Sequence, residues 1–180
     1  MYWIVSQVDV VIENFKAGTL EKLGIGYDKM IEVNPGLIYG SISGFGTYGP
    51  LSHLPCMDII AAARSGLVAQ SGQAGDAPIK PGFCDTWAGL QLLRGLSMAL
   101  LYKQRTGKGL RVDIAMLDCA FYMCEASVLE HSLTGKFSER TGNHHAWYAP
   151  YGEFAAKDGN IVIAVTDEDA WQTLCSTLGL

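Results

Sequence analysis

The sequence predicts an α/β fold, in which a parallel sheet is flanked by helices and is followed by the start of a smaller α+β domain. Two short runs, Val8–Ile12 and Leu37–Ser43, are almost continuously apolar, which is typical of strands buried on both faces. Segments with helical spacing separate these runs, and the alternation of strand and helix favours a parallel sheet. The 21 glycines among the 180 residues are many for a helical bundle and indicate frequent turns.

The first third of the chain alternates short elements with turns. Gly24 stops the first predicted helix, and Asn34-Pro35-Gly36 terminates the second. After the second strand, Gly44–Pro50 is a glycine-rich loop that leads toward a third helix. These predicted helices are Thr19–Leu23, Tyr27–Val33 and Met57–Arg64.

The longest predicted helix runs from Asp85 to about Arg105, because apolar residues recur along it at helical spacing. Thr106-Gly107-Lys108-Gly109 ends this helix with a glycine cap and with a basic residue at the negative end of the helix dipole. Arg111–Met116 alternates as a strand, and Leu117–Leu133 predicts a second long apolar helix.

A polar and aromatic segment, residues 138–150, predicts a linker between two domains. Residues 1–137 form part of the large domain, and residues 151–180 form the start of the small one. A hairpin of Tyr151–Ala156 and Asn160–Thr166 is expected there, because an Asp-Gly turn separates the two runs.

The last predicted helix is Glu168–Leu178. Thr166 and Asp169 have the three-residue spacing of a capping box, so Thr166 is the expected cap.

The composition excludes several classes of protein. The net charge is −5, from 13 Lys+Arg and 18 Asp+Glu, and the basic residues are scattered, which argues against a nucleic acid as partner. No stretch approaches the roughly 20 apolar residues of a membrane helix, so no membrane contact is expected. The five cysteines form no C-x-x-C pair and the start lacks a signal peptide, which indicates a reduced, cytoplasmic protein.

Two patterns in the chain are weak signals for a ligand. Gly44–Gly49 matches G-x-G-x-x-G, but prolines follow it and no acidic residue stands about 20 positions later, as a dinucleotide site requires. His144-His145 lacks a third ligand at suitable spacing, so we expect no metal site.

Asp85 has two interpretations that the sequence leaves open. It follows a Pro/Gly segment and begins the longest helix, so it is a suitable N-cap. The same geometry suits a nucleophile, because the helix dipole favours an ionised carboxylate and free amides nearby can stabilise developing negative charge.

Several segments in order along the chain resemble the family III CoA-transferases, the family of formyl-CoA and carnitine-CoA transferases. The similarity covers nearly the whole chain and includes an Asp-Val-Val-Ile-Glu-Asn-Phe strand and an Asn-Pro-Gly turn. The matching segments are Asp9–Phe15, Gly18–Gly24, Asn34–Tyr39, Ser41–Gly46, Arg105–Gly109, Val112–Asp118 and Ala149–Gly152.

The resemblance implies an incomplete Rossmann-like fold and a reaction that moves CoA from an acyl-CoA to a carboxylic acid. The family's catalytic aspartate falls on Asp85, which would form mixed anhydrides and an aspartyl-CoA thioester, with Asp113 and Asp118 as competing carboxylates. CoA is then a substrate, with no tightly bound cofactor. The positions implied to contact it are Asn14, Phe15, Thr19, Lys22, Leu23, Gly44 and Gly46.

Two alternative functions remain. The same fold family contains α-methylacyl-CoA racemases, whose His–Asp pattern falls on Met57 and Asp58, so the imidazole base is missing here. The second alternative is a non-catalytic remnant, because family members are about twice as long as this chain. The resemblance also implies an interlocked homodimer.

Overall fold

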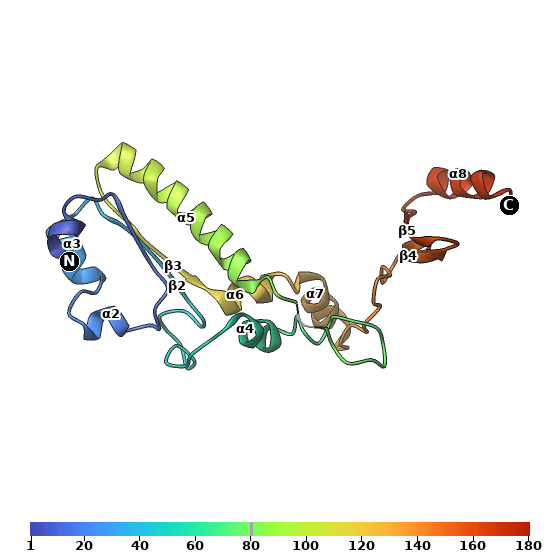
Figure 1. Ribbon diagram of the computed structural model, residues 1–180, viewed down its shortest axis with the longest axis horizontal. Coiled ribbons are helices and arrows are strands. Elements are labelled where there is room, and N and C mark those ends of the chain that lie inside the picture. Colours follow the sequence, from blue (N-terminus) through green and yellow to red (C-terminus); the bar gives the residue numbers. More distant parts are fainter. Residues whose placement is uncertain (80) are drawn as a thin grey trace. The chain divides into compact units, whose positions relative to one another are not determined.

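The computed structural model describes residues 1–79 and 81–180. They form two compact units, of which the first comprises Met1–Ala69 with Lys80–Phe137 and the second Gln70–Ile79 with Ser138–Leu180. Figure 1 labels most elements of both units.

The first unit is built on a parallel sheet of three strands, β1 (Val10–Glu13), β2 (Ile38–Ser43) and β3 (Arg111–Ala115). The central strand, β2, pairs with β1 on one side and with β3 on the other, both in parallel. All residues of β2 except Ile42 are buried, as the apolar run predicts. The predicted α/β class with a parallel sheet is therefore confirmed.

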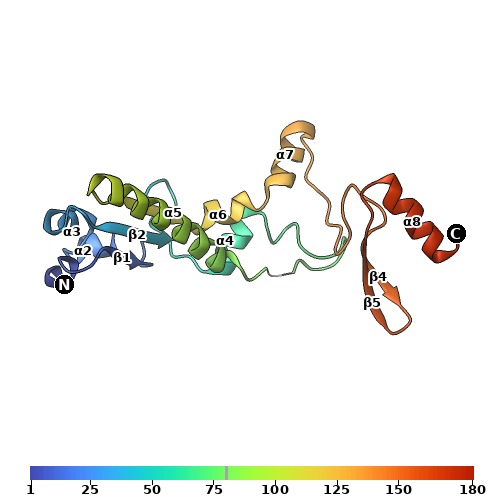
Figure 2. The same cartoon turned by 90° about the horizontal axis from the view of Figure 1, so that it is seen from above.

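The long helix α5 (Cys84–Thr106) covers one face of this sheet, as Figures 1 and 2 show. Ile38 of β2 is buried in a cluster with Leu92, Leu96 and Ala99 of α5. Gly40 allows the close packing, since a Cβ at this position would lie 3.0 Å from side-chain carbons of both leucines.

Three short helices pack against the first two strands: α1 (Tyr2–Val5), α2 (Thr19–Lys22) and α3 (Tyr27–Val33). Their buried side chains form a second cluster with Leu37 and Tyr39. Because side chains alternate along a strand, Tyr39 faces this cluster while its neighbour Ile38 faces α5.

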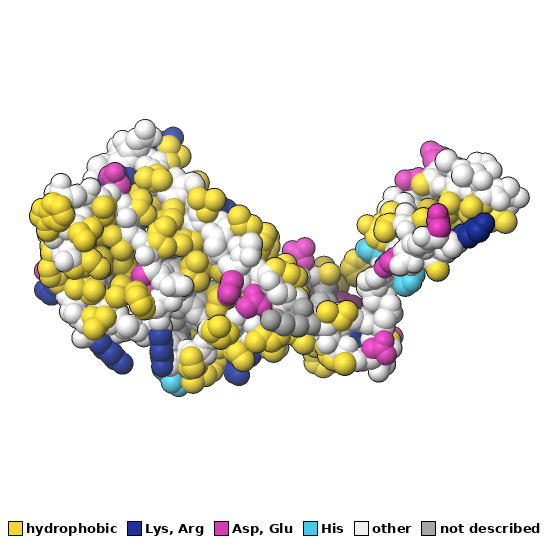
Figure 3. Space-filling model, in the orientation of Figure 1, with side chains coloured by type: hydrophobic (Ala, Val, Ile, Leu, Met, Phe, Trp, Pro, Cys, Tyr) yellow, Lys and Arg dark blue, Asp and Glu magenta, His cyan; other side chains and the backbone are white. Residues whose placement is uncertain are grey.

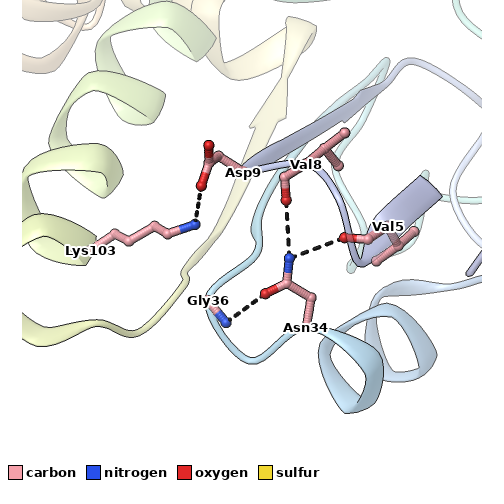
Figure 4. Close-up of polar contacts among 6 residues, drawn as sticks. All are labelled: Val5, Val8, Asp9, Asn34, Gly36 and Lys103. Atoms are coloured by element: carbon pink, nitrogen blue, oxygen red, sulfur yellow. Dashed lines mark hydrogen bonds and ion pairs between the residues drawn. The ribbon is translucent and has the colours of Figure 1, made fainter. Parts of the chain in front are cut away.

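Asn34 joins the turn after α3 to the end of α1 and to the segment that follows α1 (Figure 4). Its Nδ2 donates to the carbonyl oxygens of Val5 and Val8, each at 3.0 Å, and its Oδ1 accepts from the Gly36 amide at 3.1 Å. In the same view Lys103 of α5 pairs with Asp9, with 2.7 Å between Nζ and Oδ1.

A third cluster joins α5 to α4 (Asp58–Ser65) and α6 (Met116–Tyr122) through small buried side chains. The predicted single helix over Leu117–Leu133 is wrong, because the chain forms α6 and then α7 (Glu125–Thr134). Three residues of α6 are buried, as is Cys124 at the break, but none of α7 is. The helix therefore breaks where its contact with the core ends, and sequence periodicity does not show that point.

The second unit contains an antiparallel hairpin of β4 (Tyr151–Ala156) and β5 (Gly159–Ala164), followed by α8 (Glu168–Leu178). Figure 2 shows the hairpin in side view. The cap of α8 is Asp167, whose Oδ1 accepts from the Ala170 amide at 2.8 Å, so the prediction of Thr166 as cap is wrong by one residue. Among the described residues, no helix is long and apolar enough to cross a membrane.

Candidate functional site

A pocket of about 440 Å³ lies at the carboxyl ends of the three parallel strands. Asn14 follows β1, Gly44 follows β2 and Met116 follows β3, and all three line this pocket. In open parallel sheets, ligands bind in the crevice outside the carboxyl ends of the strands. The sheet therefore places this pocket where an α/β protein holds its substrate.

Asp85, an exposed residue in the first turn of α5, lines the same pocket. The helix begins at Cys84, its N-cap is Phe83, and no side chain of the cap residue bonds to the helix amides. The interpretation of Asp85 as the N-cap is therefore wrong. Its carboxylate lies inside the first turn of the helix, where the dipole favours a negative charge.

The backbone amide of Asp85 donates a hydrogen bond to Oδ2 of Asp58, with a length of 3.1 Å. Asp58 is the first residue of α4, so one helix supplies an acceptor to the first turn of another. Its second oxygen, Oδ1, is buried and has no hydrogen-bond partner among the described residues.

Two thiols lie near the carboxylate of Asp85. Burial, followed by the negative charges of Asp58 and Asp85, raises the pKa of the Cys84 thiol to about 11. Burial also raises the pKa of Cys56, which lines the pocket. Because the thiolate is the nucleophilic form of cysteine, both thiols are poor nucleophiles near neutral pH.

Gly44 forms part of the pocket wall where the chain leaves β2. A Cβ on this residue would lie 1.9 Å from the Cβ of Cys56, so only glycine fits. Gly46 is buried with φ +81° and lines a neighbouring pocket of about 270 Å³ instead.

The structure brings together only some of the residues that the resemblance assigns to CoA. Asn14, Phe15 and Gly44 line the pocket with Asp85. Thr19 begins α2 and lines a much smaller hollow, while Lys22 and Leu23 are exposed at the other end of α2.

The two competing carboxylates lie elsewhere. Asp113 of β3 pairs with Arg111, with 2.7 Å between Oδ2 and Nε, and both Asp113 and Asp118 line other pockets. Asp85 is the one acidic side chain among the described residues that line the pocket at the strand ends.

The sequence interpretation did not assign Lys16, Cys56 or Met116 to the site, although all three line the pocket, and it did not predict the contact of Asp58 with Asp85. Lys16 directly follows the Asn14-Phe15 pair, and Met116 is the last residue of a predicted strand, so their positions were available from the sequence. The bond from Asp58 to the Asp85 amide links residues 27 positions apart, and no local pattern predicts it.

The two adjacent histidines belong to the second unit and contact aromatic rings. His144 packs against Phe154, and His145 lies 4.8 Å, between ring centroids, from Tyr151. Among the residues that the structure describes, no group of three or more His, Cys, Asp or Glu side chains could hold a metal ion.

Comparison with known proteins gives one consistent result. Residues 1–180 match the protein family described as CoA-transferase family III. The succinyl-CoA:mesaconate CoA-transferase of Haloarcula hispanica is 40% identical over 181 residues, covering 97% of this chain and 46% of that enzyme. The acetyl-CoA:oxalate CoA-transferase of Acetobacter aceti is 36% identical over 179 residues, covering 98% of this chain and 46% of that enzyme.

A solved structure agrees with these relatives. The crystal structure of a CaiB/BaiF family protein from Brucella suis superimposes with a TM-score of 0.86 at 34% identity. The match covers 99% of this chain and 48% of that protein. The chain thus spans about half the length of the curated relatives it matches.

Proposed function

Because the chain belongs to CoA-transferase family III, we propose that it transfers CoA from an acyl-CoA to a carboxylic acid through an aspartyl-CoA thioester on Asp85. The observation that supports this role is the position of the Asp85 carboxylate. It lies in the first turn of a long helix and lines the pocket at the carboxyl ends of the strands.

The reaction begins when a carboxylate oxygen of Asp85 attacks the thioester carbonyl carbon of the donor. The C–S bond breaks, which leaves a mixed anhydride and CoA thiolate. The thiolate then attacks the Asp85 carbonyl carbon of the anhydride, releases the donor acid as a carboxylate and forms the aspartyl-CoA thioester. Covalent catalysis of this kind divides one difficult exchange into easier steps.

The acceptor reverses this sequence. Its carboxylate attacks the aspartyl-CoA carbonyl carbon, which gives a second anhydride and again frees the thiolate. Attack of the thiolate on the acceptor's acyl carbon forms the new acyl-CoA and regenerates the Asp85 carboxylate. No proton is gained or lost, so the site needs no general base, and the raised pKa values keep Cys84 and Cys56 out of the exchange.

The contacts with CoA are assigned in two groups. Asn14, Phe15 and Gly44 line the pocket with Asp85 and are proposed to contact the acyl-pantetheine portion. Thr19, Lys22, Leu23 and Gly46 lie outside that pocket, and their assignment to CoA rests on the resemblance alone. Lys22 is exposed and basic, which suits the nucleotide phosphates.

The proposed acceptor is a dicarboxylic acid. The two relatives described above are named for mesaconate and oxalate, and another, from Agrobacterium fabrum, for succinate and glutarate. Among the described residues that line the pocket, Lys16 is the one basic side chain. Its ammonium group is suited to the carboxylate that does not react, because the Asp85 carboxylate would otherwise repel a dianion.

We also propose that the protein acts as a homodimer in the cytoplasm and that residues 1–137 and 151–180 belong to its large and small domains. Figure 3 shows hydrophobic side chains over the surface of the first unit, and the exposed ones include Leu90, Leu93 and Met98 of α5. Large exposed apolar patches mark interaction surfaces. A monodisperse monomer in light scattering would contradict the dimer.

The decisive experiment traps the covalent intermediate. The purified protein is incubated with acyl-CoA and then with hydroxylamine, and the digest is examined by mass spectrometry. We expect the peptide that contains Asp85 to be modified and those containing Asp113 and Asp118 to be unmodified. Asp85→Asn should lower transfer at least about a thousandfold while the melting temperature stays unchanged, because an amide cannot form the anhydride. An active Asp85→Asn variant would remove the proposal.

A further inference from the structure

We propose that Asp58 is a positioning residue, which holds the first turn of α5 from outside that helix and so fixes the place of the Asp85 carboxylate. The proposal rests on the function proposed above for Asp85. It assigns to Asp58 a role in the same site without contact to the substrate.

The first turn of α5 has no local side-chain cap. Helices leave their first amides without partners inside the helix, and a Ser, Thr, Asp or Asn at the N-cap usually accepts from one of them. Here the N-cap is Phe83, which has no suitable side-chain acceptor. Oδ2 of Asp58 accepts from the Asp85 amide at 3.1 Å and so takes over the role of the cap residue.

The amide that Asp58 holds belongs to Asp85 itself. The amide and the side chain share one Cα atom, and only two rotatable bonds separate that atom from the carboxylate oxygens. A bond to this amide therefore restrains the Cα atom from which the reacting group projects. A misplacement of about 1 Å in a reacting group can lower the rate about a hundredfold.

Asp58 lies on a rigid support. Ala61 and Ala62, in the same short helix, are fully buried in the cluster that also contains Cys84 and Ala88 of α5. The hydrogen bond from the Asp85 amide to Asp58 and this cluster thus hold the start of α4 beside the start of α5. Supporting residues position a site best when packing locks them in place.

The second oxygen of Asp58 indicates that stability alone does not account for this carboxylate. Oδ1 is buried and has no hydrogen-bond partner among the described residues, which is unfavourable for a carboxylate oxygen. An acceptor is needed at the Oδ2 position only. Asparagine can place its amide oxygen there, whereas alanine leaves the Asp85 amide without the acceptor.

Hydrogen exchange tests the structural part of the proposal without any need for activity. In Asp58→Ala, exchange in the peptide that covers the start of α5 should rise about tenfold or more, and in Asp58→Asn it should remain near the wild-type rate. Asp167→Ala is the matched control, because it removes the carboxylate that caps α8. That control should raise exchange at the start of α8 and leave α5 unchanged.

Kinetics test the positioning role. Asp58→Ala should lower kcat about ten- to a hundredfold with KM for acyl-CoA within about twofold of the wild-type value, and Asp58→Asn should restore most of kcat. Unchanged exchange at the start of α5 in Asp58→Ala would overturn the proposal. Equal losses of kcat in the Asn and Ala variants would also overturn it, because the effect would then come from the charge and not from the hydrogen bond.

The outcome is separable from that of the proposed function. An active Asp85→Asn enzyme would end the nucleophile assignment, whatever Asp58 does. An inactive Asp85→Asn enzyme together with an Asp58→Ala variant of normal kcat would leave the nucleophile in place and remove only the positioning role.

Discussion

Gly44 and Cys56 approach so closely that the Cβ of Cys56 would lie 1.9 Å from a Cβ on residue 44. This contact closes the loop after β2 against the segment before α4, and both residues line the pocket that contains Asp85. The shape of the pocket wall therefore depends on the absence of one side chain.

Gly44→Ala should destabilise the protein and reduce acyl-CoA binding. Overpacking a close contact costs about 1–3 kcal/mol, and the new methyl group must displace Cys56. The double variant Gly44→Ala/Cys56→Gly removes the clashing Cβ and should recover most of the binding. Gly89→Ala is the control, because a Cβ at this position in the interior of α5 would have no atom within 4 Å. This substitution should stabilise the protein by about 0.5–1 kcal/mol. Denaturant unfolding measures stability, and titration with CoA measures binding. A double variant that is no more stable and binds no more tightly than Gly44→Ala would show that the clash with Cys56 is not the cause.

The buried thiol of Cys84 predicts a loss of stability at alkaline pH. Folding raises its pKa from 9.0 to about 11, so below pH 9 both the folded and the unfolded states hold the proton. Between pH 9 and about 11 the unfolded chain releases the proton while the folded protein retains it, which favours unfolding. Cys84→Ala should therefore lose less stability than the wild type over this interval.

Unfolding midpoints at pH 7, 9 and 10.5 would show this difference. Comparison with the wild type removes the contributions of other groups that titrate in the same range, and Cys175→Ala controls for the loss of a cysteine in the other unit. Parallel profiles of stability against pH for the wild type and Cys84→Ala would show that folding does not raise the pKa of the Cys84 thiol.

Lys16 should distinguish dicarboxylic from monocarboxylic acceptors. A hydrogen bond to a charged group contributes about 1.5–3 kcal/mol, so Lys16→Met should raise KM for succinate or mesaconate about ten- to a hundredfold. KM for acetate should change little, since acetate has no second carboxylate. Lys29→Met, which removes an exposed lysine that pairs with Glu32 at 3.1 Å, should alter neither value. An equal increase in KM for both acceptor classes would assign Lys16 to CoA binding instead.

Exposed Met57, at the position of the racemase histidine, predicts that the protein does not exchange an α-proton. With a branched acyl-CoA in deuterium oxide, no deuterium should enter the α-carbon during CoA transfer, because no imidazole base is present at this position. NMR or mass spectrometry of the recovered acyl group measures the uptake. Rapid exchange without transfer would favour the racemase alternative.

The sequence predicted the central strand well because its burial leaves a direct pattern of apolar residues. The prediction for Val8–Ile12 was less accurate, because β1 runs over Val10–Glu13 and none of its residues is buried. The apolar run Leu37–Ser43 differs from β2 by one residue, and the helix Tyr27–Val33 has the predicted bounds. Elements held by distant contacts were less predictable. The end of α6 depends on where the core ends, and the role of Asp85 as N-cap was excluded by where α5 begins.

The residues of the site also divide into those with a local sequence pattern and those placed by distant contacts. Asn14, Phe15 and Gly44 line the pocket, and the sequence singled them out because they belong to two segments with recognisable patterns. The acceptor for the Asp85 amide is supplied by a separate helix, and its position depends on how small side chains pack between α4 and α5. Such a contact exists only in the folded chain.

The long segment between β2 and β3 has a consequence for how the protein is made. The central strand β2 can pair with β1 early, since only two short helices separate them, but its other partner, β3, comes after the whole of α5. On a ribosome, one edge of β2 therefore waits with unpaired backbone groups until β3 emerges. Non-local strand pairing is slow, and an open edge is a template for another chain. Synthesis rate and chaperone supply should thus affect the yield of this protein more than that of a protein whose paired strands lie close together in the sequence.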